Sequence, residues 1–537
     1  MGLLADTVFI NGQVVTVNEK NDVAEALAIK DNKIVYVGSN AGAKSFADDA
    51  AEVVDLKGRS LLPGFTDAHE HVLVRGSNEL GVDCRSPKMK SIEDIKAAIA
   101  EAAKNTPKGE WVRGWGYDHS KLAEGRHPDR FDLDEAAPDH KVSIVRVCNH
   151  IGTFNTNAMK AAGVTDDTTE ICGSPTGQRN GVCNGVMFEK AFMEVVSKAR
   201  PTTEEMVEGL SLVNDMFVKE GITCCHDAGG HGAASMKAFQ RGVEQGKIKV
   251  RLVTMLFALI GETASFSDLY IDSGIYTGFG NDNLKLGPIK IMVDGSSSGP
   301  TAATLEDYTS MPGNRGLVSL EEDYINDVVM RAHVAGYQMT AHAVGDRGVT
   351  LVVNALEKAL KAHPRADHRH RIEHCAMLTP DLIKRIKELG IVPVAQPIFL
   401  YEFGDGYIRN YGEDRGGNLM PSKDLMDAGI RVVGSSDCPV TFSNPLLNMH
   451  VAVNRETQTG QLVGARNRIE LMDAIRMFTY NSAWVSFDEK KRGSLEVGKL
   501  ADVIVLSEPL LDVAKDKIKD VVVDMTFING EKLYTRK

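Results

Sequence analysis

The sequence lacks an excess of basic residues. It contains 61 lysines and arginines against 73 aspartates and glutamates, so its formal net charge is −12 and its isoelectric point is about 5.7. A protein that binds nucleic acid without sequence preference needs a positively charged footprint for the phosphate backbone. The composition therefore argues against a nucleic-acid partner, and we expect the partner to be a small-molecule substrate.

Cysteine patterns and long apolar runs are also missing. The eight cysteines show no CxxC pair and no regular spacing, so neither a disulfide framework nor a zinc ribbon is indicated. Reduced thiols are typical of a cytosol, and the adjacent Cys224 and Cys225 are expected in the core. No apolar stretch is long enough to span a bilayer, and no signal peptide is visible. We expect a cytoplasmic protein with no membrane partner.

The length and the two ends of the sequence predict two unequal domains. The 537 residues, 43% of them hydrophobic and 25% charged, exceed the size of one ordinary core. Short β patterns occur at both ends, and each end contains the phrase Phe-Ile-Asn-Gly, at 9–12 and at 527–530. Asn-Gly is a strong hairpin signal. We expect residues 1–61 and 489–537 to form one small β-sandwich domain together.

The middle of the sequence alternates between short apolar strands and amphipathic helices. Apolar residues recur at helical spacing over 322–335, 349–362 and 380–389. Candidate strands lie at 61–69, 142–149, 221–227, 286–293, 337–342, 370–374, 391–396 and 430–435. Eight strands with helical crossovers predict an α/β fold, a (β/α)8 TIM-like barrel over 62–488. Residues 84–141 and 151–200, rich in turn formers and charge, are expected to be insertions.

Two histidines close the first candidate strand, in the phrase Asp67-Ala68-His69-Glu70-His71. Catalytic residues of such barrels gather at the C-terminal ends of the strands. Side chains two positions apart on a strand point to the same side, so His69 and His71 can both present nitrogen to one ion. A His-x-His pair alone is often a surface or core feature. Its position at a strand end, after Pro63-Gly64, favours a metal site.

The fourth candidate strand contains a lysine, Lys290, among apolar residues. A buried lysine is costly unless its charge is removed or paired. One interpretation is that Lys290 reaches solvent or pairs with Asp294. The other is carboxylation by carbon dioxide, which converts the amine to a carbamate able to bridge two cations and is favoured by a lowered pKa.

Three further strand ends present metal-binding side chains: His342 in Thr-Ala-His-Ala, His374 in Arg-Ile-Glu-His-Cys, and Asp437 in Gly-Ser-Ser-Asp-Cys-Pro. Either histidine alone would more often be a hydrogen-bonded core residue, and Asp437 could be a helix N-cap. Two histidines at successive strand ends, beside an existing His-x-His pair, favour ligands. Asp437, the carboxylate of the last strand end, is then interpreted as a ligand and proton shuttle.

The phrases PGFTDAHEH, GPIKIMVDGS, AHAVGDR, RIEHC and GSSDCPV, in this order, resemble the amidohydrolase superfamily. More narrowly, they are similar to the branch that includes the N-substituted formamide deformylases. The resemblance implies two divalent metal ions, expected to be zinc, although members differ in using one or two. It implies this ligand set: His69, His71 and Asp437 for one ion, His342 and His374 for the second, and carboxylated Lys290 as the bridge. Many relatives form dimers, so the resemblance is compatible with a homodimer, although the sequence does not determine the oligomeric state.

Four residues are weaker candidates for the substrate pocket: His150, Tyr117, Asp118 and His226. His150 follows the candidate strand 142–149 and resembles a histidine that the family keeps near its substrate; the alternative is a structural hydrogen bond. Tyr117 and Asp118 lie in an expected insertion, where an aromatic cluster is often a packing element. His226 ends a candidate strand, where a substrate role and a core hydrogen bond are equally open.

These features predict a metal-dependent hydrolase that cleaves an amide-like C–N bond of N-acyl or N-formyl type with a metal-activated water. Asp437 would accept the proton of the water and deliver it to the departing nitrogen. A cyclic-amide, lactone or ester hydrolase would use the same two-metal site. Deaminases of the superfamily usually lack the bridging lysine, so Lys290 argues against them. A metal-free binding or regulatory barrel is the alternative from another class.

Overall fold

The computed structural model describes residues 4–147, 151–230, 232–258 and 262–537. The chain divides into two units, one formed by Met1–Val72 with Asn214–Lys537 and the other by Leu73–Val213. In the described part of the chain, no helix combines the length and apolar character needed to cross a membrane.

Eight parallel strands form the centre of the first unit. Their order in the sheet is β22-β21-β20-β19-β18-β17-β16-β8. Backbone hydrogen bonds join the two ends of this order, because Asp437 N–H donates to His69 O at 2.8 Å and His71 N–H donates to Cys438 O at 2.8 Å. The predicted (β/α)8 barrel is therefore confirmed. The strands are β8 (Phe65–Glu70), β16 (Ile222–Gly230), β17 (Arg251–Phe257), β18 (Leu284–Met292), β19 (Met339–Ala343), β20 (Arg371–His374), β21 (Val392–Ala395) and β22 (Val433–Gly434).

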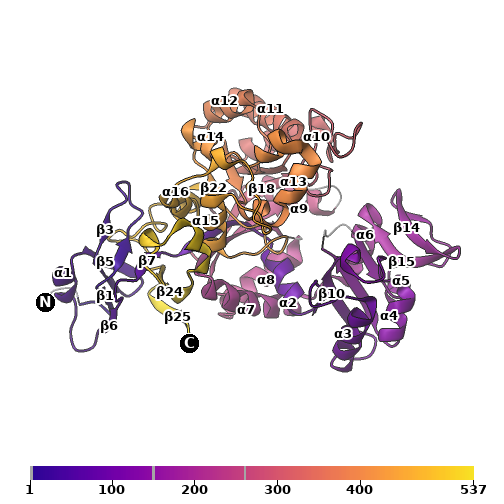
Figure 1. Cartoon of the computed structure of the whole chain (residues 1–537), viewed down its shortest axis with the longest axis horizontal. Coiled ribbons are helices and arrows are strands. Elements are labelled where there is room, and N and C mark those ends of the chain that lie inside the picture. Colours follow the sequence, from indigo (N-terminus) through magenta and orange to yellow (C-terminus); the bar gives the residue numbers. More distant parts are fainter. Residues whose placement is uncertain (1–3, 148–150, 231, 259–261) are drawn as a thin grey trace. The chain divides into compact units, whose positions relative to one another are not determined.

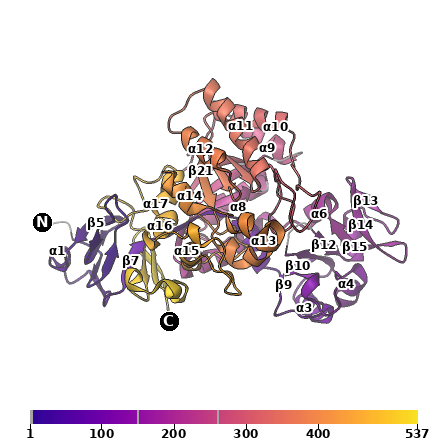
Figure 2. The same ribbon diagram turned by 45° about the horizontal axis from the view of Figure 1, so that its top comes forward.

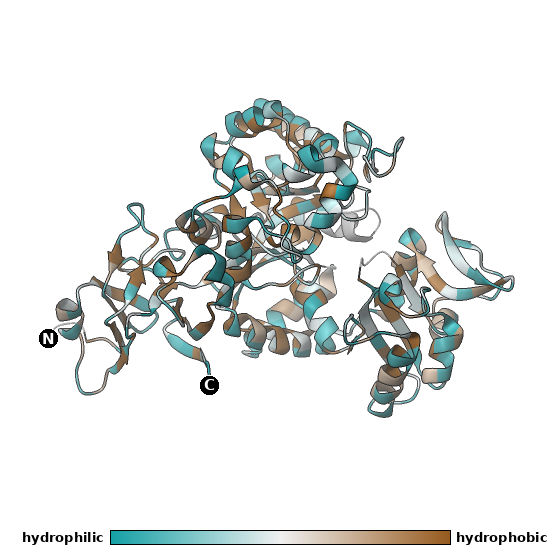
Figure 3. Cartoon of the chain, viewed as in Figure 1, coloured by the Kyte–Doolittle hydropathy of each residue, from teal (hydrophilic) through white to brown (hydrophobic). Residues whose placement is uncertain are grey.

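Amphipathic helices cover the outside of the barrel. In α12 (Pro380–Leu389), Thr379 caps the first turn, proline occupies the start of the helix, and Gly390 ends it with a φ of 68°. Helices α10, α11 and α12 lie next to one another in both ribbon views (Figures 1 and 2), α10 and α11 contact β19, and Figure 3 shows hydrophilic residues along these helices. The other helices of this part of the chain include α7 (Thr203–Lys219), α8 (Ala233–Glu244), α9 (Glu262–Asp272), α10 (Glu322–Val334), α11 (Asp346–Ala362), α13 (Ile398–Gly417), α14 (Ser422–Asp427), α15 (Pro445–Asn454), α16 (Leu471–Met477) and α17 (Tyr480–Val485).

One candidate barrel strand was wrong. The segment predicted at 142–149 contains β11 (Lys141–Arg146), which pairs with β10 and β12 in another sheet rather than in the barrel. The strand in its place is β17, which was not among the candidates. A short apolar run has the same pattern in either sheet, so the pattern alone does not tell which sheet a strand joins.

The two ends of the chain meet in one β-sandwich, as predicted. A six-stranded sheet has the order β25-β24-β23-β7-β2-β3, and a four-stranded sheet has the order β5-β4-β1-β6. Residues from both ends fill the core between them, including Phe9, Leu61, Val503 and Phe527. The strands are β1 (Thr7–Ile10), β2 (Gln13–Val15), β3 (Val23–Ala24), β4 (Ala26–Lys30), β5 (Lys33–Gly38), β6 (Glu52–Asp55), β7 (Ser60–Pro63), β23 (Val503–Leu506), β24 (Val523–Ile528) and β25 (Glu531–Thr535).

The second unit, Leu73–Val213, has its own mixed sheet, of order β13-β14-β15-β12-β11-β10-β9, and its own apolar clusters. It enters the sequence between the first two barrel strands. Its strands are β9 (Val82–Asp83), β10 (Trp111–Tyr117), β11, β12 (Ile151–Phe154), β13 (Glu170–Ile171), β14 (Ser174–Arg179) and β15 (Val182–Phe188), and its helices include α3 (Ile92–Lys104), α4 (Arg130–Ala136), α5 (Thr156–Ala161) and α6 (Glu189–Val196).

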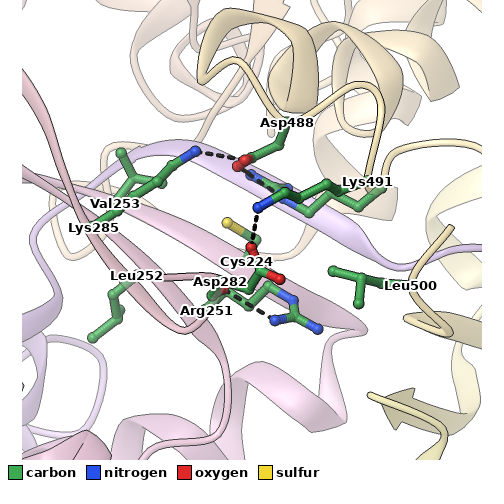
Figure 4. Close-up of a pocket in the computed structure, with 10 residues that line it drawn as sticks. Cys224, Arg251, Leu252, Val253, Asp282, Lys285, Asp488, Lys491 and Leu500 are labelled. Atoms are coloured by element: carbon green, nitrogen blue, oxygen red, sulfur yellow. Dashed lines mark hydrogen bonds and ion pairs between the residues drawn. The ribbon is translucent and has the colours of Figure 1, made fainter. Parts of the chain in front are cut away.

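A buried and a half-buried ion pair attach the barrel to the C-terminal segment at the N-terminal ends of β17 and β18. Arg251, 3% exposed, bonds both carboxylate oxygens of Asp502 at 2.6 and 2.9 Å. Lys285 bonds Asp488 at 2.6 Å beside a cavity of about 10 Å³, drawn in Figure 4. Such a cavity has room for about one water molecule. Desolvated pairs of this kind fix geometry, because removing one partner leaves an uncompensated buried charge.

Candidate metal centre

The predicted ligands lie at the C-terminal ends of the barrel strands. His69 lies on β8 with His71 directly after it, Lys290 lies on β18, and His342 lies on β19. His374 is the last residue of β20, and Asp437 follows β22. Because all eight strands are parallel, these residues share one end of the barrel, where side chains from different strands converge.

Asp437 lies at the centre of the cluster. One ligand atom from each of His69, His374 and Asp437 lies within 4.8 Å of the others, and all three residues are buried. Oδ1 of Asp437 is 3.3 Å from Nε2 of His69 and 3.2 Å from Nε2 of His71. Burial alone would raise the pKa of Asp437, but His69 and His71 hold it well below its ordinary value.

These residues fit a divalent metal ion. Oδ1 of Asp437 is buried and makes no geometrically acceptable hydrogen bond to a described residue, although two imidazole nitrogens lie close to it. A buried carboxylate oxygen of this kind needs a cation or a donor. Imidazole nitrogen and carboxylate oxygen are the ligands that zinc commonly takes in catalytic sites.

Lys290 lies against this cluster. Its side chain is buried, with Nζ 3.2 Å from Nε2 of His69 and 5.6 Å from the ring centroid of Phe257. Burial lowers the pKa of the Lys290 amine. The alternative partner, Asp294, instead accepts backbone N–H bonds from Ala303, Val344 and Gly345 at 2.9–3.0 Å. The site therefore holds an amine of reduced basicity beside His69, the condition that favours carboxylation.

Hydrogen bonds fix the rings of the other two histidines. Nδ1 of His374 lies 2.8 Å from Oε1 of Gln396, a carbonyl oxygen that only accepts, so Nδ1 carries the hydrogen and Nε2 the lone pair. Nε2 of His342 donates to Gly295 O at 3.0 Å. The two rings lie 4.4 Å apart between centroids. His342 and His71 lie near the group formed by His69, His374 and Asp437, but they are not among the three residues whose ligand atoms lie within 4.8 Å of one another.

Two of the clustered residues have left-handed backbone conformations. The φ angle is 69° at His374 and 61° at Asp437. Such conformations cost of order 1–3 kcal/mol for residues other than glycine and concentrate at functional sites. The hydrogen bond from Asp437 N–H to His69 O helps hold the second of them. The fold thus maintains strained backbone at two positions that carry the predicted ligands.

Glu373 and Arg371 belong to the site, and the sequence reasoning missed both. Oε2 of Glu373 lies 2.5 Å from Nδ1 of His69, and Nε of Arg371 lies 2.6 Å from Oε1 of Glu373. Burial opposes ionisation of Glu373, yet Arg371 holds its pKa well below the ordinary value. The available signal was alternation: two charged residues at i and i+2 on a short buried strand face the same side.

The four pocket candidates have different outcomes. His226 lies on β16, fully buried, with Nδ1 3.2 Å from Nη1 of Arg371, so it supports Arg371 and is not in the ligand group. Burial and Arg371 place the pKa of His226 well below its ordinary value. Tyr117 bonds His127 at 3.0 Å, and Asp118 bonds Arg146 at 3.0 Å, all within the second unit. His150 lies outside the described residues.

Comparison with known proteins gives the family. The model of the amidohydrolase family matches residues 52–534. The chain belongs to the amidohydrolase family.

Individual relatives agree with this assignment. The amidohydrolase is 28% identical over 553 residues to an N-substituted formamide deformylase of Arthrobacter pascens, a match that covers 100% of this chain and 99% of that protein. The structure of a metal-dependent hydrolase from Pyrococcus horikoshii OT3 matches with a TM-score of 0.79 and 25% identity, over 95% of this chain and 99% of that one. An adenosine deaminase from Xanthomonas campestris with bound zinc, 14% identical, shares the fold with a TM-score of 0.58 over 99% of this chain and 93% of that one. The protein is thus a metal-dependent hydrolase of the amidohydrolase superfamily.

Proposed function

We propose that this amidohydrolase cleaves an amide-like C–N bond of the N-acyl or N-formyl type. The observation that carries the proposal is the buried Asp437 carboxylate, placed within 3.3 Å of His69 and His71 at the C-terminal end of the barrel. The full-length similarity to a formamide deformylase supports the choice of bond.

The proposal assigns ligands to two metal ions. His69, His71 and Asp437 would hold one zinc ion, His342 and His374 a second, and Lys290, once carboxylated, would bridge them. A bound divalent ion lowers the pKa of a water molecule toward neutrality and polarises a carbonyl oxygen. Two ions per chain are part of the proposal.

Asp437 performs the proton transfer. Its carboxylate accepts the proton of the attacking water and delivers it to the nitrogen that departs from the acyl carbon, so an acid and an amine are released. His69 and His71 hold the pKa of Asp437 well below its ordinary value, so the carboxylate is ionised before the water is deprotonated. Its strained backbone and the bond to His69 O hold the carboxylate in place before substrate binds.

The test combines metal content with a substrate panel. Protein purified without chelators is analysed for zinc and assayed on N-formyl amines, N-acyl amines, cyclic amides, lactones and esters. We expect about two zinc ions per chain, with hydrolysis of the N-formyl or N-acyl compounds exceeding that of esters and lactones. His69→Ala and His342→Ala should each lose one ion, whereas the exposed His363→Asn should keep both.

Other outcomes choose among the alternatives. Preferential cleavage of lactones, esters or cyclic amides would replace the proposed bond while retaining the metal site. One ion that survives His342→Ala would indicate a mononuclear enzyme. A chain that binds no metal, and gains no activity when metal is added, would favour the binding or regulatory barrel.

A further inference from the structure

We propose that Glu373, held by Arg371, is a positioning residue that sets the tautomer and the ring orientation of His69. This inference rests on the proposed metal role of His69. It concerns two residues that contact neither substrate nor metal in the proposed ligand set. Their action is exerted through His69 alone.

The carboxylate of Glu373 has partners for both oxygens. Oε2 lies 2.5 Å from Nδ1 of His69 and accepts from Nη2 of Arg371 at 3.0 Å. Oε1 accepts from Nε of Arg371 at 2.6 Å and from the hydroxyl of Thr340. The side chain is 0% exposed. Glu373 is therefore a fully bonded, desolvated acceptor with one fixed position.

That position determines which nitrogen of His69 is available. A carboxylate paired with arginine only accepts, so Nδ1 of His69 carries the hydrogen and donates it. In the neutral ring that a metal ion binds, Nε2 then keeps its lone pair, and it lies 3.3 Å from Oδ1 of Asp437 and 3.2 Å from Nζ of Lys290. The lone pair thus faces the cluster where the ion is expected. The opposite tautomer would place a hydrogen there and would leave Glu373 facing a bare nitrogen.

Arg371 fixes this arrangement across three strands. Besides both oxygens of Glu373 on β20, its guanidinium donates to Ala68 O on β8 at 2.5 Å and to Nδ1 of His226 on β16 at 3.2 Å. Ala68 directly precedes His69, so one guanidinium positions both the backbone that carries the imidazole and the carboxylate that orients it. The planar fork of arginine suits such multiple bonding, which a lysine would not reproduce.

The expected effect follows from metal sites in general. A metal-bound histidine usually donates its other ring hydrogen to a carboxylate or carbonyl group, and loss of that partner lowers metal affinity by about 10–100-fold. Glu373→Gln keeps the size of the side chain but removes the charge that favours a hydrogen on Nδ1. We expect zinc affinity to fall by about 10–100-fold, with a change in the protonation pattern of His69.

The experiment compares Glu373→Gln with a matched control, Glu489→Gln. Glu489 also pairs with an arginine, at 2.9 Å from Arg369. Arg369 lies two residues before β20, away from the predicted ligands. Zinc affinity is measured by chelator competition. The tautomer is read from nitrogen NMR spectra of histidine-labelled protein, with the His69 signals assigned through His69→Ala. Only Glu373→Gln should change both quantities.

Unchanged zinc affinity and unchanged His69 signals in folded Glu373→Gln would overturn the proposal, as would an equal loss in Glu489→Gln. If Glu373→Gln does not fold, Glu373→Asp replaces it. The aspartate keeps the charge but, held by Arg371, is too short to reach Nδ1 of His69, so wild-type affinity in that variant would also overturn the proposal.

The outcomes separate this inference from the proposed function. Zinc affinity that depends on Glu373, in a chain that cleaves no amide, would refute the proposed reaction and keep the positioning role. Amide hydrolysis with zinc affinity independent of Glu373 would refute the positioning role and keep the reaction.

Discussion

Nδ1 of His333 lies 2.9 Å from Nε2 of His370, in a buried pair at the end of the barrel opposite the metal ligands. Nδ1 of His370 accepts from Met339 N–H, so its Nε2 carries a hydrogen and donates it to His333. Nε2 of His333 lies 2.7 Å from His363 O and donates to it. Each ring is thus neutral with an assigned tautomer, and neither has a nitrogen left for a second hydrogen.

This pair predicts loss of stability in mild acid. Burial lowers the pKa of His333 and sets that of His370 well below its ordinary value of 6.5. Since the unfolded chain binds these protons at a higher pH than the folded chain, the free energy of unfolding decreases as pH falls below about 6.5. Replacing His370 by Gln should reduce the slope of unfolding free energy against pH between pH 7 and 5 by up to about 1.4 kcal/mol per pH unit.

The control for this experiment is His363→Asn, which changes an exposed side chain and keeps the carbonyl that accepts from His333. Urea unfolding at several pH values measures the slope. Because the metal ligands titrate equally in all three proteins, their contribution cancels. Equal slopes in wild type and His370→Gln would show that the pair does not take up protons on unfolding.

The ion pair between Arg251 and Asp502 predicts a large loss of stability when one partner is removed. Arg251→Met leaves a buried carboxylate whose main counter-charge is gone, so the free energy of unfolding should fall by about 3–5 kcal/mol. Urea unfolding gives the change. The control is Lys104→Ala, which breaks an ion pair with Glu101 whose side chains are 69% and 67% exposed. This change should lower the free energy of unfolding by about 1 kcal/mol or less. Similar losses at both sites would contradict this account.

Asp437→Asn tests the proton transfer. The amide keeps the shape of the side chain but does not accept a proton, so kcat for the amide substrate should fall by about 10²–10⁴-fold. Far-ultraviolet circular dichroism should remain that of the wild type. The control is Asp427→Asn, because Asp427 is an exposed carboxylate that pairs with Lys423. This change should leave kcat unchanged. Turnover within a factor of two of wild type would refute the role of Asp437.

Metal removal should lower thermal stability. An ion bound only by the folded chain adds about 2.7 kcal/mol when its free concentration is 100 times Kd. Treatment with a chelator should therefore lower Tm by a few degrees, and added zinc should restore it. His69→Ala should show a smaller response to both treatments. If a chelator does not change the Tm of the zinc-loaded wild type, these buried side chains do not bind the ion.

The sequence predicted the barrel, the β-sandwich made from both ends and a cluster that the structure brings together. His69 and His374 lie at the ends of their strands and Asp437 follows its strand. Parallel strands end on one side of a sheet, so these positions predict that the three residues lie near one another. Their role as ligands remains a prediction. The strand at 142–149 was misplaced because its apolar residues serve equally well in the sheet of the second unit.

Glu373 and Arg371 show what the sequence pattern did not reveal. Their importance depends on partners far away in the chain, since Glu373 contacts His69 and Arg371 contacts Ala68 and His226. Nothing local to β20 specifies those contacts. His226 was found as a candidate, but its relation to Arg371 gives it a supporting position that the sequence did not distinguish from a substrate role.

The pairing of β7 with β23 imposes an order on biosynthesis. In the six-stranded sheet, β7 lies between β2 and β23, with Pro63 opposite Val503. The ribosome makes β23 roughly 440 residues after β7, which at about 5–20 residues per second takes roughly 20–90 s. Until β23 is made, Leu61 and Leu62 lack the strand that pairs with them in the finished sheet, and an unpaired strand edge is a surface prone to aggregation. A nascent chain that stalls before residue 503 keeps this edge exposed, so incomplete translation products should be cleared by proteolysis rather than accumulate as partly folded enzyme.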